Sequence, residues 1–217
     1  AAIQSEKIAY IVMLAGPGIP GIDILVAQGE LINRAAGAPE AVVEMNARVQ
    51  STLADIAKEE PDPEKAGPLM RSAMREEIAL LPQAIMELIP ESQINDVAIN
   101  TTVNQFNSPW FRFFLHYDPR PVLEQVSVPV LAIFGEKDLQ VPHELNVPEI
   151  EAAFERGNNE AATVRVLPGL NHLFQKAESG APSEYQQIEE TFNQSALELV
   201  SSWILKQFTS PKLDTLS

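Results

Sequence analysis

Residues 8–21 read IAYIVMLAGPGIPG, and this stretch decides the fold class. Its first half, Ile8 to Leu14, is an unbroken apolar run rich in β-branched and aromatic residues, and its second half is rich in glycine and proline. A strand that faces water on one side alternates polar and apolar residues, whereas a strand buried on both faces does not. The stretch therefore predicts a buried strand of a parallel sheet that leads into a loop.

Two later runs have the same form, and each is closed by glycine or by Pro-Gly. They are VPVLAIF at 128–134 and ATVRVL at 162–167. The second run alternates more, which favours a position nearer the edge of the sheet. Helices are expected over 146–156 and 189–207. The order strand, helix, strand, helix predicts an α/β fold with a parallel sheet and right-handed crossovers.

Residues 22–117 differ from the rest of the chain, because they contain no convincing strand. Apolar residues recur at helical spacing from Val42 to Ile56 and again from Met70 to Leu81. We therefore expect an all-helical insertion over 22–117. It would interrupt an α/β core formed by residues 1–21 and 118–217.

Composition and charge exclude several classes of function. The chain has 30 acidic residues against 15 lysines and arginines, a formal net charge of -15, which would repel nucleic acid. No apolar run approaches the roughly 20 residues of a membrane span. Without cysteine, disulfides and Cys-ligated metals are excluded within this chain, and no other metal or cofactor motif is present. Ala1 to Lys7 show neither an initiator Met nor a signal peptide, so we expect a chain entered midway.

An acid and a histidine follow two neighbouring strands of the expected sheet. Asp138 ends the segment FGEKD, and His172 ends the segment PGLNH after the next strand. Adjacent parallel strands lie about 4.8 Å apart, so side chains that leave their carboxyl ends can meet. We expect a hydrogen bond between Asp138 and His172. The alternatives are a turn or capping role for Asp138 and a backbone-bonded loop role for His172. His116, expected to be packed, and His143, expected to be exposed, are weaker candidates.

This pair, its order and the helical insertion resemble the C-terminal half of an α/β-hydrolase with a cap. The resemblance is narrower to bacterial serine carboxylesterases and S9-type peptidases, and it covers nearly the whole chain. It implies a partial α/β-hydrolase sheet with an inserted helical cap, Asp138 as the triad acid and His172 as its base. The segments that carry it are SPWFR at 108–112, YDPRP at 117–121, GEKDLQVP at 135–142 and LPGLNHLF at 167–174.

The sequence departs from this family at the nucleophile. The family's serine lies in a Gly-x-Ser-x-Gly elbow before the strand expected at 8–14, and this motif is absent here. The oxyanion hole, which uses the N–H after the nucleophile, would be missing as well. We expect the chain alone to be nearly inert, because loss of the nucleophile costs about 10⁶ in kcat. Serines are present, among them Ser5, Ser108, Ser127 and Ser183, but they lack the elbow and are not expected to act as the nucleophile.

The expected substrate is a small ester or amide, and aromatic residues gather where the insertion rejoins the core. Ser108 and a first-turn proline predict the start of a helix over 110–116. On this helix Trp110, Phe111 and Phe114 are expected to wall the substrate site or to pack in the core. Arg112 would bind a substrate carboxylate or form a structural ion pair.

The loop over 15–21 and Asp23 each have two possible roles. The loop over 15–21 would line the acyl pocket or serve as a plain connection. Asp23 is a reserve triad acid or the cap of the first inserted helix. The strand at 8–14 would have an open edge, which predicts association with a separate N-terminal half or with a second copy.

A second hypothesis is a non-catalytic α/β-hydrolase-like module that binds a partner or ligand through its insertion. An upstream Gly-x-Ser-x-Gly motif would decide for the hydrolase, and a natural N-terminus at Ala1 would decide for the module. Esterase, peptidase, lactonase and dehalogenase activities stay open, because the nucleophile decides among them. The sequence does not indicate a compartment, although members of the family are often secreted or periplasmic.

Overall fold

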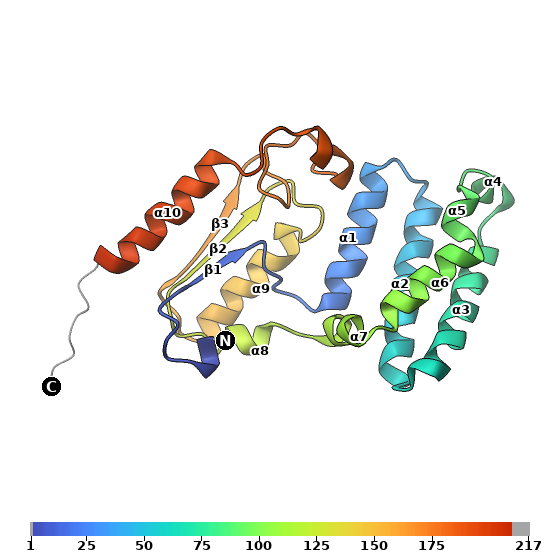
Figure 1. Ribbon diagram of the computed structural model, residues 1–217, viewed down its shortest axis with the longest axis horizontal. Helices are drawn as coiled ribbons and strands as arrows, with labels where there is room; N and C mark the ends of the chain where they lie inside the picture. Colours follow the sequence, from blue (N-terminus) through green and yellow to red (C-terminus); the bar gives the residue numbers. More distant parts are fainter. Residues whose placement is uncertain (1, 210–217) are drawn as a thin grey trace. The chain divides into compact units, whose positions relative to one another are not determined.

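The computed structural model describes residues 2–209 of the chain (Figure 1). These residues divide into two compact units. The sheet unit comprises residues 2–18 and 120–209, and the helical unit comprises residues 19–119. The protein is of the α/β class.

A parallel sheet of three strands, β1 (Ile11–Leu14), β2 (Val130–Gly135) and β3 (Ala162–Leu167), forms the centre of the sheet unit. The strand order is β1-β2-β3, with Leu14 opposite Ile133 and Gly135 opposite Leu167. The predicted parallel arrangement and the edge position of β3 are confirmed. β2 is buried along its whole length, as its uninterrupted apolar run predicts. The expectation of a buried strand over 8–14 is wrong in part, because β1 is shorter, none of its residues is fully buried and Leu14 is exposed.

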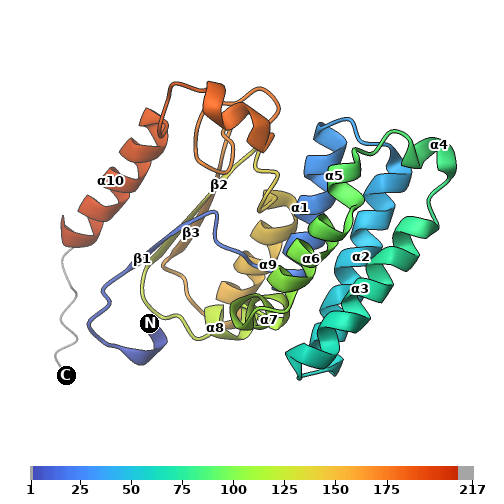
Figure 2. The same ribbon diagram turned by 45° about the vertical axis from the view of Figure 1, so that its right-hand side comes forward.

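The strands lie between α9 and α10 in both views (Figures 1 and 2). α9 buries Ile150 and Phe154, while Trp203 of α10 meets the ring of Tyr10 edge-on at 5.8 Å. Both helices differ from their expected bounds, since α9 begins earlier, at His143, and α10 begins later. The helices of the sheet unit are η1 (Ala2–Gln4), α8 (Arg120–Leu123), α9 (His143–Arg156), η2 (Pro182–Gln187) and α10 (Gln194–Thr209).

The helical unit, whose residues 19–119 are all described, contains no strand. Ser108 caps α7 by accepting a hydrogen bond from the Phe111 N–H at 3.3 Å, as predicted. Asp23 does not cap α1; Pro20 occupies that position and Asp23 lies in the first turn. The helices are α1 (Gly21–Ala35), α2 (Glu40–Glu59), α3 (Pro63–Ala79), α4 (Gln83–Met86), α5 (Glu91–Ile94), α6 (Asp96–Phe106) and α7 (Pro109–His116).

One apolar cluster holds the helical unit together. Leu53 of α2, Met70 of α3 and Leu115 of α7 are fully buried in it. Most of the residues that the helical spacing selected lie in this cluster, and the remaining two, Ile56 and Ile78, pack against it, because that spacing places them on one face of each helix. Within residues 2–209, no helix is both long enough and apolar enough to cross a membrane.

Truncation of the cluster tests this description of the core. Leu53→Ala should lower the free energy of unfolding by about 2–5 kcal/mol, because it leaves a cavity among buried side chains. Leu80→Ala is the matched control, since Leu80 is 72% exposed. Urea unfolding followed by circular dichroism measures both variants. Equal midpoints for the two variants would contradict the assignment of Leu53 to the core.

Candidate acid–base site

Asp138 lies in the turn that follows β2, and its side chain is fully buried. Its Oδ1 accepts hydrogen bonds from the N–H groups of Gln140 and Val141, both at 2.8 Å. Its Oδ2 lies 2.9 Å from Nδ1 of His172. The turn role and the contact with histidine therefore coexist, because each uses a different carboxylate oxygen.

His172 lies in the loop after β3, and its side chain remains 28% exposed. The expected hydrogen bond to Asp138 is present. A carboxylate can only accept, so Nδ1 carries the hydrogen and Nε2 of the neutral ring keeps its lone pair. Among residues 2–209, none forms a hydrogen bond with that Nε2. His172 thus combines a fixed tautomer with an open basic nitrogen.

Gly135 allows the two loops to approach each other. A Cβ at this position would lie 2.3 Å from the carbonyl oxygen of Leu170 and 2.6 Å from that of Asn171. The N–H of Glu136 donates to the carbonyl oxygen of Leu167, the last residue of β3, at 2.9 Å, and the N–H of Lys137 donates to that of Leu170 in the following loop at 2.8 Å. The turn that carries Asp138 is therefore bonded, through its backbone, to the loop that carries His172.

Asn171, which the sequence analysis did not single out, organises the histidine loop from inside. It is fully buried, and its Oδ1 accepts from the N–H groups of Leu173 at 3.0 Å and Gln175 at 2.9 Å. Its Nδ2 donates to Oε1 of Gln175 at 3.0 Å. The signal in the sequence was an asparagine in a glycine-containing loop, which favours such a turn.

The loop that leaves β1 is tied to α9. The N–H of Gly18 donates to Oδ1 of Asn146 at 2.7 Å, and Asn146 is fully buried. A Cβ at Gly18 would lie 2.5 Å from the carbonyl oxygen of Asn146. Ala15, at the start of the loop, has a positive φ of 47°. These contacts give the loop a defined conformation, and its part in an acyl pocket stays a prediction.

The aromatic candidates belong to the helical unit, whereas Asp138 and His172 belong to the sheet unit. Phe111 is only 6% exposed and packs in the apolar cluster. Phe114 is half-buried, and Trp110 stacks on it with ring centroids 5.4 Å apart while remaining 67% exposed. Of the two expected roles, packing in the core describes the position of Phe111. A contact between a substrate and any of the three aromatic residues stays a prediction.

Arg112 joins the C-terminal end of α2 to α7. Its Nη1 donates to the carbonyl oxygens of Ala57 at 2.7 Å and Glu60 at 2.9 Å. Its Nε and Nη2 both donate to Oδ1 of Asn107, at 3.1 and 2.6 Å. A cation suits this place because carbonyl groups at a helix end are unpaired and carry negative partial charge. The structural partners are carbonyl and amide oxygens rather than a carboxylate, and a substrate role stays a prediction.

The two remaining histidines are placed differently from the expectation. His116 is exposed rather than packed, and desolvation, with Lys58 and Arg112 acting in the same direction, lowers its pKa. His143, the first residue of α9, is half-buried rather than exposed, and its Nε2 lies 3.3 Å from Oε1 of Glu144. Neither ring contacts a buried carboxylate among the described residues.

Tyr185 is linked to the Asp138 turn through the side chain of Gln140. Nε2 of Gln140 donates to the hydroxyl oxygen of Tyr185 at 2.9 Å, and the N–H of the same glutamine donates to Asp138. Burial raises the pKa of Tyr185 above its ordinary value. Tyr185 therefore stays protonated at neutral pH and supports the turn as a neutral group.

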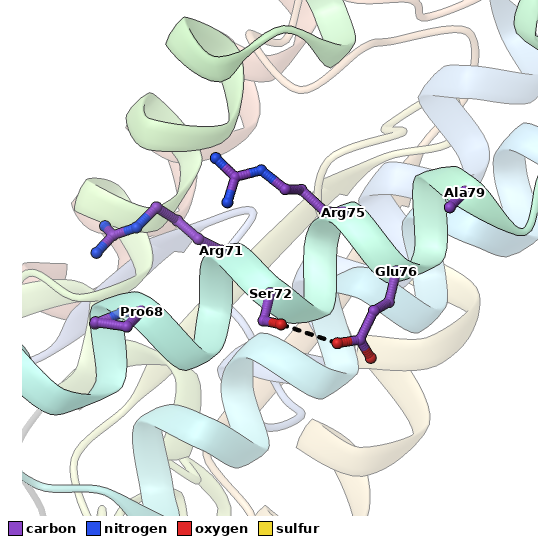
Figure 3. Close-up of a pocket in the computed structure, with 6 residues that line it drawn as sticks. All are labelled: Pro68, Arg71, Ser72, Arg75, Glu76 and Ala79. Carbon is purple, nitrogen blue, oxygen red and sulfur yellow. Dashed lines mark hydrogen bonds between the residues drawn. The ribbon is translucent and has the colours of Figure 1, made fainter.

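A separate hollow of about 460 Å³ lies on α3 (Figure 3). Arg71 and Arg75 point to one side of this helix, while Ser72 donates to Glu76 at 2.9 Å. Arg75 also pairs with Asp96 at 2.8 Å. None of the predicted site residues lines this hollow. In the part of the chain that is described, no three His, Asp or Glu side chains are grouped to hold a metal ion.

Comparisons with other proteins give no match. No protein-family model, curated protein or solved structure matches the chain. The chemistry of the site is therefore that of its own groups: a buried carboxylate and an imidazole whose outer nitrogen is open.

The hydrogen bonds of Arg112 predict that its removal destabilises the helical unit. Arg112→Ala should lower the free energy of unfolding by about 1–3 kcal/mol, because it leaves partly buried carbonyl oxygens without donors. Arg71→Ala, also on the helical unit, should change it by less than about 0.5 kcal/mol. Thermal and urea unfolding of both variants measure the difference. Equal stabilities would refute the structural role of Arg112.

Proposed function

We propose that Asp138 and His172 are the acid and the base of a serine hydrolase of the α/β-hydrolase type, which cleaves carboxylic esters. The observation that carries the proposal is the 2.9 Å contact between Oδ2 and Nδ1 at the carboxyl ends of adjacent parallel strands. Functional groups of open α/β sheets lie at this end. The open Nε2 supports a role in proton transfer.

In the proposed mechanism, Nε2 of His172 takes the proton of a serine hydroxyl as its oxygen attacks the ester carbonyl. The imidazolium then gives this proton to the leaving alcohol, and an acyl-enzyme remains. In the second half, His172 takes a proton from the water that attacks the acyl group. It then gives this proton to the serine oxygen as the acyl bond breaks, which releases the acid and regenerates both the serine and the neutral imidazole. Asp138 stays ionised throughout, fixes the tautomer and stabilises the imidazolium.

The proposal places the nucleophile and the oxyanion hole on polypeptide outside these 217 residues, because Gly-x-Ser-x-Gly does not occur in them. The edge of β1 supports this arrangement. Among the described strands, β1 and β3 each pair on one side only, with β2, and Leu14 at the end of β1 is 49% exposed. A strand that leads to the nucleophile would pair along this edge. In its absence, the same edge is a template for a second copy.

The substrate in this proposal is a small ester or amide. Trp110 and Phe114 would offer an apolar wall to its acyl part, whereas Phe111 packs in the core and the guanidinium of Arg112 is held by carbonyl and amide oxygens. The exposed face of Trp110 is the part of this set that is open to a ligand.

Activity in the longer protein tests the acid–base assignment. In a protein that joins this chain to a Gly-x-Ser-x-Gly segment, His172→Ala should lower kcat on p-nitrophenyl esters by about 10⁶, and Asp138→Asn by about 10⁴. His116→Gln is the control and should retain activity, because His116 is exposed and lies in the other unit. Wild-type turnover by His172→Ala would refute the assignment.

Association of the 217-residue chain tests the open edge. We expect the chain alone to self-associate, and a lysine in the edge strand, Val12→Lys, to reduce the associated fraction. Thr163→Lys on β3, the opposite edge, is the matched control and should leave association unchanged. Size-exclusion chromatography with light scattering measures both. A stable wild-type monomer with cooperative unfolding would contradict the role of the β1 edge.

A further inference from the structure

Glu136 makes a contact that neither the sheet nor the proposed chemistry explains. Its Oε2 accepts a hydrogen bond from the N–H of Gly169 at 2.7 Å, although the glutamate itself is exposed. Gly169 has a positive φ of 69° and opens the loop that carries His172. An exposed carboxylate thus holds a glycine of left-handed backbone conformation near the start of the histidine loop.

The far side of the same loop is held by the next residue. Nζ of Lys137 donates to the carbonyl oxygens of Ala177 at 2.9 Å and Glu178 at 2.6 Å. His172 lies in the chain between these two anchored points, Gly169 and Ala177. The side chains of two consecutive residues in the Asp138 turn therefore clamp the histidine loop at both of its ends.

The clamp can affect the Asp138–His172 contact more than it affects the fold. The sheet, Asn171 and the apolar packing of Phe174 define where the loop runs, whereas a hydrogen bond of 2.9 Å depends on displacements of a few tenths of an ångström. Asp138 cannot follow a displaced ring, because its Oδ1 is fixed by two N–H groups. A small shift of the loop would therefore open the contact.

We propose that Glu136 is a positioning residue, which acts through Gly169 to hold Nδ1 of His172 on Oδ2 of Asp138. Glu136 is suited to a test because its side chain is exposed and can be replaced without a cavity. Gly135 is not, since any side chain there would collide with the loop. The inference concerns the geometry of the pair and does not depend on ester hydrolysis.

The Nδ1 proton of His172 is the readout, because a proton held between imidazole and a buried carboxylate exchanges slowly and is visible by NMR. The 217-residue chain, labelled with ¹⁵N-histidine, would be measured at neutral pH, and His172→Gln would assign the signal. We expect the signal in the wild type and in Glu136→Gln, whose side-chain oxygen still accepts from Gly169. We expect its loss in Glu136→Ala and in Glu136→Asp, which is too short to reach.

Glu124→Ala is the control, because it also removes one surface carboxylate of the sheet unit, which is paired with Arg156. It should keep the signal. Melting temperatures of all variants separate a local effect from unfolding, and Glu136→Asp replaces Glu136→Ala if the latter does not fold.

The outcomes are distinguishable. A signal that persists unchanged in Glu136→Ala or, if that variant does not fold, in Glu136→Asp overturns the role of Glu136 and leaves the proposed hydrolase untouched. Its loss in Glu136→Gln as well shows that charge, not the hydrogen bond, matters, and also overturns the proposal. Absence of the signal in the wild type contradicts the Asp138–His172 bond itself, and the proposed function with it.

Discussion

The site depends on one close approach, that of the loop after β3 to Gly135. Two carbonyl oxygens lie where a side chain would begin, so the position admits only glycine, although its φ is not positive. Because β2 and β3 are paired up to Gly135 and Leu167, the turn after one strand meets the loop after the other. Asp138 and His172 then meet without any contribution from the helical unit.

Buried polar groups gather at this end of the sheet. Each one costs free energy unless it is hydrogen-bonded, so their location is informative. Outside these residues, the buried positions of the described chain are apolar or small, and Asn171 and Asn146 both bond loops that leave strand ends. The set consists of Asp138, Asn146, Asn171 and Gln175. Polar side chains are thus buried where their hydrogen bonds fix the loops at the strand ends. Asp138 and His172 lie in the same place.

The sequence predicted features that follow from periodicity or from strand ends. Parallel strands bring consecutive carboxyl ends together, which was enough to place Asp138 beside His172. It did not predict Asn171 or Glu136, because each bonds a backbone N–H in an irregular loop, and no repeat spacing marks such a partner. The early start of α9 was missed for a related reason: Pro142 precedes the helix without a capping side chain, so the usual start signal is absent.

The carboxylate of Asp138 is held in a way that assigns the chemistry to a single atom. One oxygen is occupied by two N–H groups and the other by Nδ1, and the side chain has no contact with solvent, so the carboxylate cannot itself take a proton from a substrate. The imidazole tautomer follows from this, because Nδ1 must donate. Nε2 of His172 is then the one basic atom of the pair that a reacting group can reach. Since backbone donors fix the carboxylate, the position of this basic atom is set within the sheet unit alone.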